Sequence, residues 1–409
     1  MARPQLLFLA HRIPYPPDKG DKIRSWNILR HLAETYDVHL GAFVDDPADM
    51  RHLDVLRDVC ADVFCIPTTG GSCKLRALKS LPGEIPLSVA MLQDPRMRAY
   101  VDDKCDAGEA ETIYLFSGQM APYALRHASR RRLILMDFVD VDSDKFRQFA
   151  NTARLPMKSI YLREAKRLHQ FEKQVARAVD ASLFVSQDEA ALFRRTAGSY
   201  AHTVHALENG VDTDFFDPAP FRAEADPAPN IIFTGAMDYL PNVEAARWLA
   251  KEILPAVRKR VPGASLTIVG ARPGRDVQRL AGAGIEVTGR VEDVRPYFGR
   301  AAVAAAPMKT ARGVQNKVLE GMAMQLPVVT TPAGLSGIDA EPGRHLLVAE
   351  VTEGLAAQIA GLLEDRERAR DIGEAARAHV VRRYGWAHQL SVLDSIIAEL
   401  RPEAKAMAS

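Results

Sequence analysis

The stretch PMKTARGVQNKVLEGMAMQLPVVTT, residues 307–331, decides the fold class of this 409-residue chain. It follows an apolar run, Ala301–Ala306, that is typical of a buried strand in a parallel sheet. The pattern then predicts a helix from Asn316 to about Met324 and a second strand over Pro327–Thr331. Strand, loop, helix and strand in this order form a βαβ unit. The stretch therefore predicts an α/β fold that binds ligands at the carboxyl ends of its strands.

The loop of this stretch, Lys309–Gln315, has the composition of an anion site. It holds Arg312 and Gly313, and Lys317 follows at the start of the helix. The free N–H groups of a helix N-terminus attract anions, and Glu320, one turn further, could hold the hydroxyls of a ribose. A nucleoside diphosphate fits this arrangement, but so does an ordinary βα unit with a solvated cation pair.

The second half of the chain repeats the order of strand and helix. Strands are predicted at Ile231–Thr234, Ser265–Val269 and Ile285–Thr288, and they end in Gly235, Gly270 and Gly289. Helices are predicted over Asn242–Arg260, Val294–Phe298, Glu353–Leu363, Arg366–Tyr384 and Trp386–Leu400. This alternation predicts a doubly wound parallel sheet, and the glycines let a ligand approach the backbone. No loop has the GxGxxG pattern of a dinucleotide site.

The first half predicts a second sheet of the same kind. Its candidate strands are residues 5–10, Val38–Val44, Val63–Ile66, Thr112–Phe116, Arg132–Phe138 and Ala181–Val185. A helix is predicted from Ile23 to about Tyr36, and another begins with a capping box at Ser186 and Glu189. Residues 218–230 are rich in Pro, Ala and charge without any period, so composition places a domain boundary there.

Length and composition predict two to three domains of an ordinary globular protein. Hydrophobic residues make up 47% and charged residues 26%, and the net charge of +1 gives no reason to expect nucleic acid as a partner. No apolar run is long enough for a transmembrane helix, and the apolar N-terminus is interpreted as a strand rather than a signal peptide. We therefore expect a cytoplasmic protein. Four cysteines match no zinc pattern and are expected to be reduced, buried thiols: Cys60, Cys65, Cys73 and Cys105.

Two stretches of the first half hold further candidate site residues. Gly20, in the loop DKGDK, allows a tight turn or the close approach of a ligand. Four carboxylates crowd the end of the strand Arg132–Phe138: Asp137, Asp140, Asp142 and Asp144. They could bind a metal ion or supply a general base, and a loop with aspartate caps explains them equally well.

Residues 151–177 are predicted to form one basic helix. It carries seven cationic residues against Glu164 and Glu172, a net charge of +5. Ile160, Leu168, Phe171 and Val175 could supply an apolar stripe, so the helix could lie on anionic lipid headgroups. A helix with a solvated basic face is the commoner explanation of such a pattern.

Residues 205–390 closely resemble the C-terminal domain of GT-B glycosyltransferases of the family-4 type. The resemblance rests on the order and spacing of the 307–331 stretch and five further segments: ENGVDTDFFDP, IIFTGAMDYLPNVEAARWL, LTIVGARP, VTGRVEDVRPYF and the late RRYGW. The N-terminal HRIPYPPDKGDKIRSWNILRHLA and the segment DFVDVDSDKF are similar to sugar transferases of bacterial exosortase (PEP-CTERM) and exopolysaccharide systems.

This resemblance implies two Rossmann-like domains facing across a cleft. Residues 1–204 would take the acceptor and residues 205–385 the nucleotide-sugar, while 386–409 would form a helix crossing back to the first domain and a disordered tail. It implies donor contacts for the following residues: Gly20, Gly235, Asn242, Arg290, Val291, Gly313, Gln315, Asn316 and Glu320. Glu320 matches the second glutamate of the E-x7-E pattern and would hold the ribose hydroxyls.

The chain departs from the family pattern in two places. Arg312 stands where the first glutamate of E-x7-E would face the sugar ring. The histidine expected after the fourth or fifth N-terminal strand is not found, and Asp140 and Asp142 occupy that region.

The predicted activity is transfer of a sugar from a nucleotide diphosphate-sugar to a hydroxyl of a glycan or polyprenyl-linked acceptor. Arg312 and Lys317 would stabilise the diphosphate leaving group without a metal ion or other cofactor, and Asp140 would act on the acceptor. Retention of configuration and a role in exopolysaccharide synthesis are implied by the resemblance alone. The segment 154–177 could add a peripheral contact with the anionic inner membrane.

Three alternatives stay open. A sugar-nucleotide epimerase or hydrolase of the same shape would convert the donor without an acceptor. A non-catalytic subunit would bind a nucleotide-sugar without turnover, which the missing glutamate favours. An NAD-dependent dehydrogenase is the third alternative, and the chain lacks the GxGxxG fingerprint of that class.

Overall fold

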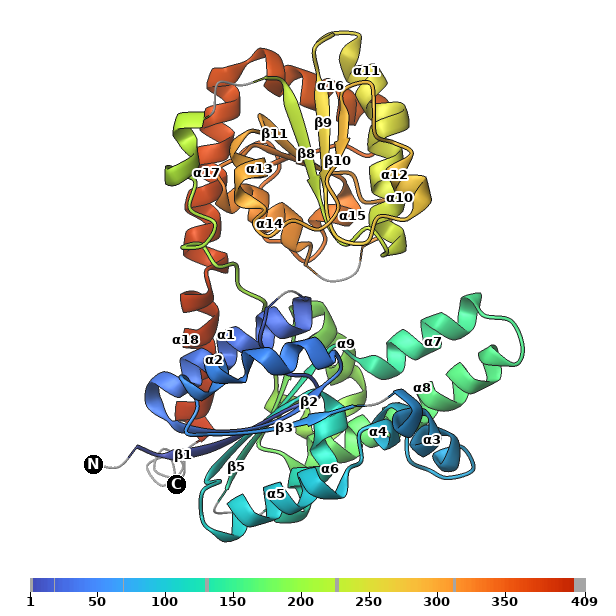
Figure 1. The fold of residues 1–409 in the computed structure, drawn as a ribbon, viewed down its shortest axis with the longest axis vertical. Helices are drawn as coiled ribbons and strands as arrows, with labels where there is room; N and C mark the ends of the chain where they lie inside the picture. Colours follow the sequence, from blue (N-terminus) through green and yellow to red (C-terminus); the bar gives the residue numbers. More distant parts are fainter. Residues whose placement is uncertain are drawn as a thin grey trace. The chain divides into compact units, whose positions relative to one another are not determined.

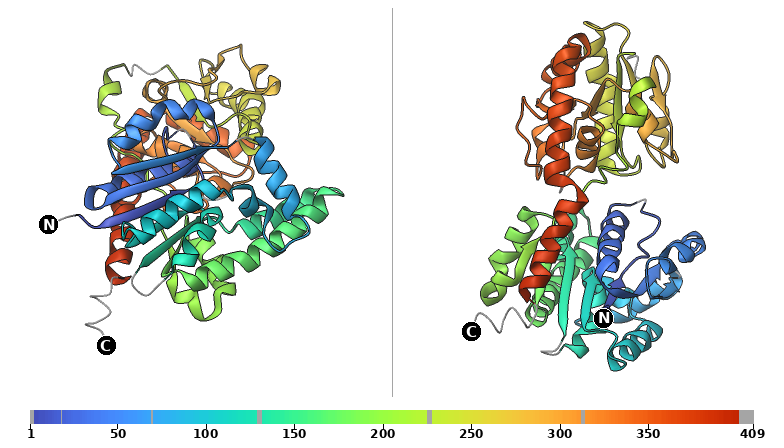
Figure 2. Two further views of the ribbon diagram at one scale, coloured as in Figure 1. Left: turned by 60° about the horizontal axis from the view of Figure 1, so that its bottom comes forward. Right: turned by 90° about the vertical axis from the view of Figure 1, so that its left-hand side faces the viewer.

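The computed structural model describes residues 3–17, 19–68, 70–128, 132–224, 228–311 and 314–400 (Figure 1). The described residues form two compact units. One comprises Met1–Glu208 with Leu390–Ser409, and the other comprises Asn209–Gln389. Each unit has its own parallel sheet with helices on both faces (Figure 2). No helix among the described residues is both long and apolar enough to cross a bilayer.

The first unit is built on a seven-stranded parallel sheet in the order β3-β2-β1-β4-β5-β6-β7. Its strands are β1 Gln5–Ala10, β2 Asp37–Val44, β3 Asp62–Pro67, β4 Thr112–Phe116, β5 Leu133–Val139, β6 Ala181–Phe184 and β7 Val204–Ala206. Leu7 of β1 pairs with His39 of β2 on one side and with Ile113 of β4 on the other. The strand order reverses between β1 and β4, so the crevice that open α/β sheets use for ligands lies at the carboxyl ends of these two strands.

Helices cover both faces of this sheet. They are α1 Gly20–Thr35, α2 Leu53–Arg57, α3 Gly70–Ser80, α4 Leu87–Met91, α5 Pro95–Asp106, α6 Ala121–Ala124, α7 Asp142–Thr152, α8 Met157–Ala178 and α9 Gln187–Ala197, with 3-10 turns η1 Pro47–His52, η2 Gly118–Met120, η3 Leu125–His127 and η4 Gly198–Thr203. The predicted first-half strands are confirmed. The predicted cap of α9 is also confirmed, because Ser186 Oγ accepts a hydrogen bond from the backbone N–H of Glu189 at 3.2 Å. All four cysteines are free, and Cys60, Cys73 and Cys105 are buried as predicted.

The second unit holds a six-stranded parallel sheet in the order β10-β9-β8-β11-β12-β13. Its strands are β8 Asn230–Thr234, β9 Ser265–Val269, β10 Ile285–Val287, β11 Val303–Ala306, β12 Val328–Thr330 and β13 Leu347–Val348. Its helices are η5 Ala219–Glu224, α10 Leu240–Trp248, η6 Leu249–Ile253, α11 Leu254–Arg258, α12 Arg275–Gln278, α13 Arg295–Gly299, α14 Asn316–Ala323, α15 Pro332–Leu335, α16 Thr352–Glu364 and α17 Arg366–Tyr384. The βαβ unit predicted from 307–331 is confirmed as β11, α14 and β12.

Alternate residues of each central strand serve two different cores. Ile231 and Phe233 of β8 pack with the α10, α11 and α16 layer, whereas Ile232 packs with the α14 and α17 layer. Burial on both faces explains why these strands are continuous apolar runs instead of alternating ones. The predicted helix Asn242–Arg260 is one rod interrupted by the π-helical turn η6. This turn ends two residues before Pro255, which has no N–H to donate.

The predicted basic helix over 151–177 is wrong at its start. Helix α7 ends at Thr152, Ala153 is extended, and α8 begins at Met157. Pro156 explains the break, because its ring cannot continue a helix through the preceding turn. The predicted apolar stripe of α8 faces the protein interior: Leu168 and Val175 are buried, and Phe171 packs against the core of the first unit.

The domain boundary that composition places at 218–230 is also wrong. This segment lies inside the second unit, and the border between the units falls after Glu208. Phe221 on η5 holds the segment in place, because it packs so closely on α13 that a Cβ at Gly299 would lie 2.6 Å from the Phe221 Cβ. Helix α18, Trp386–Leu400, begins in the second unit, and its residues from Leu390 belong to the first. The tail 401–409, predicted to be disordered, lies outside the described residues.

A fully buried ion pair fixes α1 on the first sheet. Arg24 and Asp137 have no solvent exposure, and Nε of Arg24 lies 2.9 Å from Oδ2 of Asp137. Tyr114 donates its hydroxyl to the same carboxylate at 2.8 Å. Asp137 is therefore a structural residue of β5, and it is not available to the candidate site.

We predict that Arg24→Met lowers the free energy of unfolding by about 3–5 kcal/mol, because it leaves the Asp137 carboxylate buried without its counter-charge. Calorimetric unfolding of the two proteins measures this difference. Arg30→Met on the exposed side of the same helix is the control and should cost about 1 kcal/mol or less. Equal losses in the two variants would contradict the structural role of the buried pair.

Candidate functional site

The carboxyl edge of the second sheet exposes backbone because three loops carry glycines in contact. Gly270 after β9 lies against Gly235 after β8, so a Cβ at Gly270 would be 1.7 Å from the Gly235 carbonyl oxygen. The backbone N–H of Gly270 donates to the carbonyl of Gly289, which follows β10, at 3.2 Å. Gly235 and Gly289 adopt φ angles of 154° and 72°, which disfavour other residues. These loops therefore offer main-chain groups to a ligand with few side chains in the way.

Asn242 holds the Gly235 turn of this glycine edge in place. Its side chain is buried, and Nδ2 donates to the carbonyl of Ala236 at 3.0 Å. A Cβ at Gly235 would lie 2.7 Å from the same Nδ2. The structure thus places Asn242 as a brace for the Gly235 turn, with Oδ1 buried and without a hydrogen-bond partner among the described residues.

The N-terminus of α14 is open in the way that an anion site requires. The helix begins at Asn316, and the preceding Gln315 makes no side-chain capping hydrogen bond. Gln315 instead accepts a hydrogen bond from Lys317 Nζ through Oε1 at 3.3 Å. Arg312 and Gly313, predicted to bind the diphosphate, lie outside the described residues. Of the residues predicted to bind the diphosphate, Gln315, Asn316 and Lys317 are therefore the ones that the structure describes.

Lys317 and Glu320 lie one helical turn apart on α14, and both side chains are half-buried. Burial raises the pKa of Glu320 to about 7, and the neighbouring Lys317 charge only partly opposes this shift. Burial likewise lowers the pKa of Lys317 to about 8, against the attraction of Glu320. No hydrogen bond from another described residue reaches the Glu320 carboxylate, and Lys317 Nζ lies 5.9 Å from the ring centre of Phe233. The pair is thus poorly solvated and incompletely satisfied, which is typical of a binding site.

Arg290 and Val291 lie where the sequence predicts, on the loop after β10. Arg290 is exposed, and Val291 packs partly against the core beside α13 and α14. The loop follows Gly289, which links it to the glycine edge. Gly235, Arg290, Val291 and the start of α14 therefore share the carboxyl edge of one sheet.

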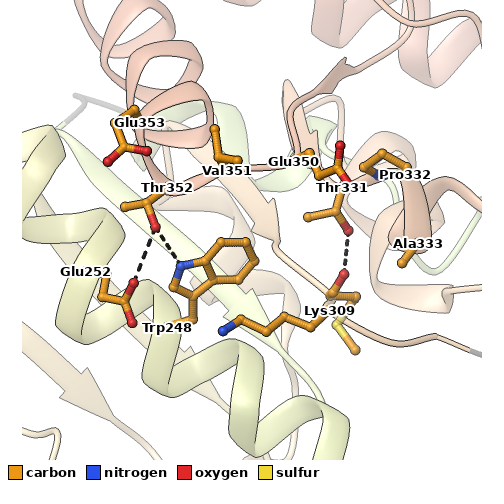
Figure 3. A pocket seen from close by; sticks show the side chains of 11 residues that line it. Trp248, Glu252, Lys309, Thr331, Pro332, Ala333, Glu350, Val351, Thr352 and Glu353 are labelled. Atoms are coloured by element: carbon orange, nitrogen blue, oxygen red, sulfur yellow. Dashed lines mark hydrogen bonds between the residues drawn. The ribbon is translucent and has the colours of Figure 1, made fainter.

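A pocket of about 460 Å³ at the same edge contains none of the predicted residues (Figure 3). Several of the residues that line it come directly after the carboxyl ends of β11, β12 and β13, among them Lys309, Thr331 and Glu350. Lys309 Nζ stands 4.7 Å from the ring centre of Trp248, whose Nε1 donates to Thr352 Oγ1 at 2.9 Å. Sequence reasoning missed this pocket because three separate loops build it. The rule that ligands gather at strand ends is the signal that could have indicated Lys309 and Thr331.

In the first unit, Gly20 and Asp140 lie at the carboxyl edge of the sheet. Gly20 is the first residue of α1, its φ is not positive, and a Cβ there would meet nothing within 4 Å. The described residues give no turn or packing reason for a glycine at this position, and the ligand-approach interpretation of Gly20 stays a prediction. Asp140 is half-buried and follows Val139, whose φ of 69° is strained for a β-branched residue.

The four carboxylates near β5 do not form one cluster. Asp137 pairs with Arg24, while Asp142 lies 3.5 Å from Lys145 and Asp144 accepts from Gln148 at 2.5 Å. Across the described residues, no group of three or more His, Cys, Asp and Glu side chains is arranged to hold a metal ion. The interpretation of this loop as a metal site therefore has no geometric support.

Sequence reasoning also missed a charged cluster directly after β1. His11 Nε2 lies 3.4 Å from Oδ2 of Asp21, which also contacts Arg12, and Arg12 Nε lies 2.9 Å from Oδ2 of Asp45. Burial raises the pKa of Asp21, but the hydrogen bond with His11 and the Arg12 charge outweigh it and hold that pKa at about 2. The position of His11 and Arg12 right after the first predicted strand could have indicated them.

Comparison with known proteins gives one family and a set of relatives. Residues 228–365 match the family described as glycosyl transferases group 1. A GDP-mannose-dependent alpha-(1-6)-phosphatidylinositol monomannoside mannosyltransferase of Mycobacterium tuberculosis is 28% identical over 52% of this chain and 60% of its own length. The chain thus spans about three fifths of the length of such curated relatives. An uncharacterized 44.6 kDa protein in the cps region of Klebsiella pneumoniae is 22% identical over 84% of this chain and 87% of its own.

Two solved structures share the fold over nearly the whole chain. Anabaena Alr3699/HepE in complex with UDP has a TM-score of 0.67 at 16% identity, covering 97% of this chain and 100% of that one. Sucrose-phosphate synthase from Thermosynechococcus elongatus has a TM-score of 0.67 at 18% identity, covering 97% and 99%. At these identities the likeness shows the arrangement of the elements.

We predict that the stability of the protein falls as pH rises from about 5 to 7 in a way that depends on Glu320. Its folded-state pKa of about 7 lies above its ordinary value of 4.5, so the folded protein holds this proton longer than the unfolded chain does. Raising the pH through this window therefore favours unfolding, and Glu320→Gln should reduce the fall. Urea midpoints at pH 5, 6 and 7 measure it. Glu286→Gln, an exposed carboxylate on β10, is the control. An unchanged pH slope in Glu320→Gln would contradict the shifted pKa.

Proposed function

We propose that this chain transfers a sugar from a nucleotide diphosphate-sugar to a hydroxyl acceptor. Two findings support this: residues 228–365 match the group 1 glycosyltransferases, and the two doubly wound sheets have the GT-B fold. The observation that carries the proposal is the uncapped N-terminus of α14 beside the half-buried Lys317 and Glu320, whose pKa values burial shifts. Unpaired N–H groups and a cation suit a diphosphate, and a carboxylate one turn further suits a ribose diol.

The second unit would bind three parts of the donor: the diphosphate, the ribose and the base. Gln315, Asn316 and Lys317 would receive the diphosphate, together with Arg312 and Gly313. Glu320 would accept hydrogen bonds from the ribose, which supplies the donors that its carboxylate lacks in the described structure. The backbone of Arg290 and Val291, beside the open Gly235 edge, would receive the base. Asn242 supports that edge by bracing the Gly235 turn.

Departure of the nucleoside diphosphate concentrates negative charge on its phosphate oxygens. Lys317 and the N–H groups of α14 are fixed before the reaction, so they can stabilise this charge without first reorganising. Arg312 would add a second cation. The proposal assigns this task to the chain's own groups and needs neither a metal ion nor a cofactor.

The acceptor is assigned to the first unit. Asp140 would orient or deprotonate the acceptor hydroxyl, and Gly20 would let the acceptor or the donor phosphates approach the backbone of α1. Retention of configuration, a glycan or polyprenyl-linked acceptor, a cytoplasmic location and a place in exopolysaccharide or PEP-CTERM-associated synthesis belong to the same proposal. The cps-region relative is consistent with a surface-polysaccharide role.

Peripheral contact with an anionic membrane was predicted for residues 154–177. We retain it only for the beginning of this range, because Leu168 and Val175 further along α8 are buried in the core. Leu155, Met157 and Leu162 are exposed and can meet a lipid surface.

A second candidate function is a non-catalytic subunit that binds a nucleotide-sugar, and Arg312 in place of the sugar-facing glutamate favours it. A sugar-nucleotide epimerase or hydrolase is the third. The three differ in a simple respect: only the transferase needs an acceptor to release the nucleoside diphosphate, and the binding subunit releases none.

We predict that one nucleoside diphosphate stabilises the wild-type protein and that Glu320→Ala loses this effect. Saturation at about 100 times Kd should add about 2.7 kcal/mol, which is visible as a rise in melting temperature. Thermal-shift measurements would use UDP, GDP, ADP, dTDP and NAD. UDP and GDP come first, because HepE was solved with UDP and the mycobacterial relative is named for GDP-mannose.

Glu286→Ala, on the exposed surface of β10, is the matched control and should keep the full shift. Stabilisation of Glu320→Ala equal to that of wild type would contradict the ribose contact. A shift with none of the nucleoside diphosphates would contradict the donor site itself.

We also predict that Lys317→Ala lowers kcat at least tenfold, because loss of one preorganised donor typically costs about 3 kcal/mol of transition-state stabilisation. Release of nucleoside diphosphate with and without acceptor measures it and separates the transferase from a hydrolase. Lys259→Ala, an exposed lysine on the same unit, is the control. Turnover near wild type in folded Lys317→Ala would contradict its role, and full activity of Asp140→Asn would contradict the acceptor-side assignment.

A further inference from the structure

The segment that carries Asp140 has a strained backbone. It comprises residues 139–143, which run from the last residue of β5 into the first turn of α7, and it is named the Asp140 loop. Val139 has a φ of 69°, and a β-branched residue keeps such a conformation only where its surroundings impose it. The Val139 carbonyl accepts the backbone N–H of Val185 at 2.7 Å. Asp140 therefore directly follows a fixed point of the sheet.

Two glutamates from later helices hold the loop on the other side of Asp140. Glu189 of α9 accepts the backbone N–H of Val141 through Oε2 at 2.8 Å. Glu172 of α8 accepts the backbone N–H of Ser143 at 2.9 Å and the Ser143 hydroxyl at 2.6 Å. The two carboxyl groups come 48 and 29 residues after the groups that they bind. They fix the backbone immediately after Asp140.

The charge of Glu172 depends on pH in the neutral to alkaline range. Its side chain is buried, and burial is the main cause that raises the pKa of Glu172 to about 8. The charges of Asp142 and Glu189 act in the same direction, and the hydrogen bonds from Ser143 oppose them. Lys145 lies 3.5 Å from Asp142 and balances part of its charge. Loss of the Glu172 proton above about pH 8 therefore adds a third carboxylate charge beside the loop.

Glu164, two turns earlier on α8, makes the same kind of contacts with another element. It is buried and accepts the backbone N–H groups of Leu87 and Ser88 at 2.8 and 2.9 Å, and the Ser88 hydroxyl at 2.8 Å. Arg163 Nη1 lies 3.6 Å from Glu164 Oε2. Glu164 thus has a neighbouring cation and holds α4, whereas Glu172 has neighbouring carboxylates and holds the Asp140 loop.

We propose that Glu172 and Glu189 are positioning residues that place Asp140 for the acceptor, and that a negative charge on Glu172 loosens the Asp140 loop. This inference rests on the proposed function, because the acceptor-side role of Asp140 belongs to it. The two glutamates act through the backbone of the loop. Repulsion among the three carboxylates would weaken both contacts, and a shift of about 1 Å in a reacting group can cost about a hundredfold in rate.

Hydrogen exchange in the Asp140 loop is the first test, and it needs no substrate. The backbone N–H groups of Val141 and Ser143 donate to the two glutamates, so their protection factors report these contacts directly. In the full-length wild type these factors should fall at least about tenfold from pH 7 to pH 9, because about nine tenths of Glu172 is ionised one unit above its pKa. Glu172→Gln should show no such fall, because its amide is uncharged and can still accept from the Ser143 N–H and donate to Ser143 Oγ.

The contact of Glu189 is tested in the same way. Glu189→Ala should lower the protection of the Val141 N–H at both pH values, because the acceptor is removed. Glu189→Gln should restore the protection, because the amide carbonyl can accept the same hydrogen bond. Melting temperatures show whether each variant is folded.

Acceptor-dependent release of nucleoside diphosphate is the second test. The wild-type kcat should fall about tenfold more between pH 7 and pH 9 than the kcat of Glu172→Gln, because only the wild type gains the charge. Glu189→Ala should lower kcat at least about tenfold while the KM for the donor changes less than about twofold, because the second unit binds the donor. A role in overall stability alone would not produce this difference between kcat and KM.

Glu164→Gln is the matched control, since it changes a buried glutamate of the same helix that holds α4 instead. It should keep the wild-type loop exchange and pH profile. Equal falls of protection with pH in wild type and Glu172→Gln would overturn the inference, as would wild-type protection in Glu189→Ala or equal effects of Glu164→Gln and Glu172→Gln.

The two tests also separate the inference from the proposed function. Wild-type kcat in a variant whose loop has lost its protection would overturn the positioning role. Absence of acceptor-dependent turnover in the wild type would contradict the proposed function, and the exchange measurement would still decide whether the two glutamates hold the loop.

Discussion

Parallel pairing of strands is the constraint from which both units follow. In the two sheets every strand runs parallel to its neighbours, so all carboxyl ends within a sheet meet at one edge. Each connection must return over a face of the sheet, which buries both faces and forces the apolar runs seen in β1, β8 and β11. Loops that are distant in sequence therefore meet at the carboxyl edge of the same sheet. The βαβ unit of β11, α14 and β12 delivers Lys317 and Glu320 to the same edge as Gly235 and Gly270 for this reason.

The buried charges of the chain fall into two kinds. Arg24 and Asp137 satisfy each other, and Tyr114 adds a hydrogen bond. Burial raises the pKa of Glu172 to about 8, yet its carboxylate accepts two hydrogen bonds from Ser143. Such groups have their partners inside the protein and serve the fold. Among the described residues, Lys317 donates to Gln315 and lies near the ring of Phe233, and no hydrogen bond reaches the Glu320 carboxylate, which is an unfavourable arrangement unless a ligand completes it. Whether a charged group has a partner inside the protein therefore distinguishes the candidate site from the structural ion pairs more clearly than the number of charged residues does.

Periodicity and strand-end glycines predicted most of the fold. The apolar runs, the helix after Asn316 and the capping box at Ser186 depend on neighbours within a few residues, and the structure confirms them. Most of what failed depends on distant partners. Asp137 was grouped with Asp140 because no local pattern reveals that Arg24 lies against it. The prediction of one helix over 151–177 does not take account of Pro156, although that residue indicates the break. The boundary at 218–230 was placed by composition, whereas Phe221 packs on Gly299 of a later helix. The pocket around Trp248 needs three loops, and its lining has no sequence signature.

The two half-buried charges on α14 restrict what the site can bind. Burial lowers the pKa of Lys317 to about 8 and raises that of Glu320 to about 7, so burial disfavours the charged form of each group. A diphosphate beside Lys317 would raise the pKa of its ammonium group, and hydroxyls donating to Glu320 would lower the pKa of its carboxyl. Both changes favour the charged forms at neutral pH, so a single ligand that carries an anion and a diol satisfies the two groups together. An anion alone would favour the charged form of Lys317 while making ionised Glu320 less favourable, because two negative charges would then share the site. A nucleoside diphosphate, with its ribose and phosphates about one helical turn apart, meets both requirements, whereas inorganic phosphate meets only one.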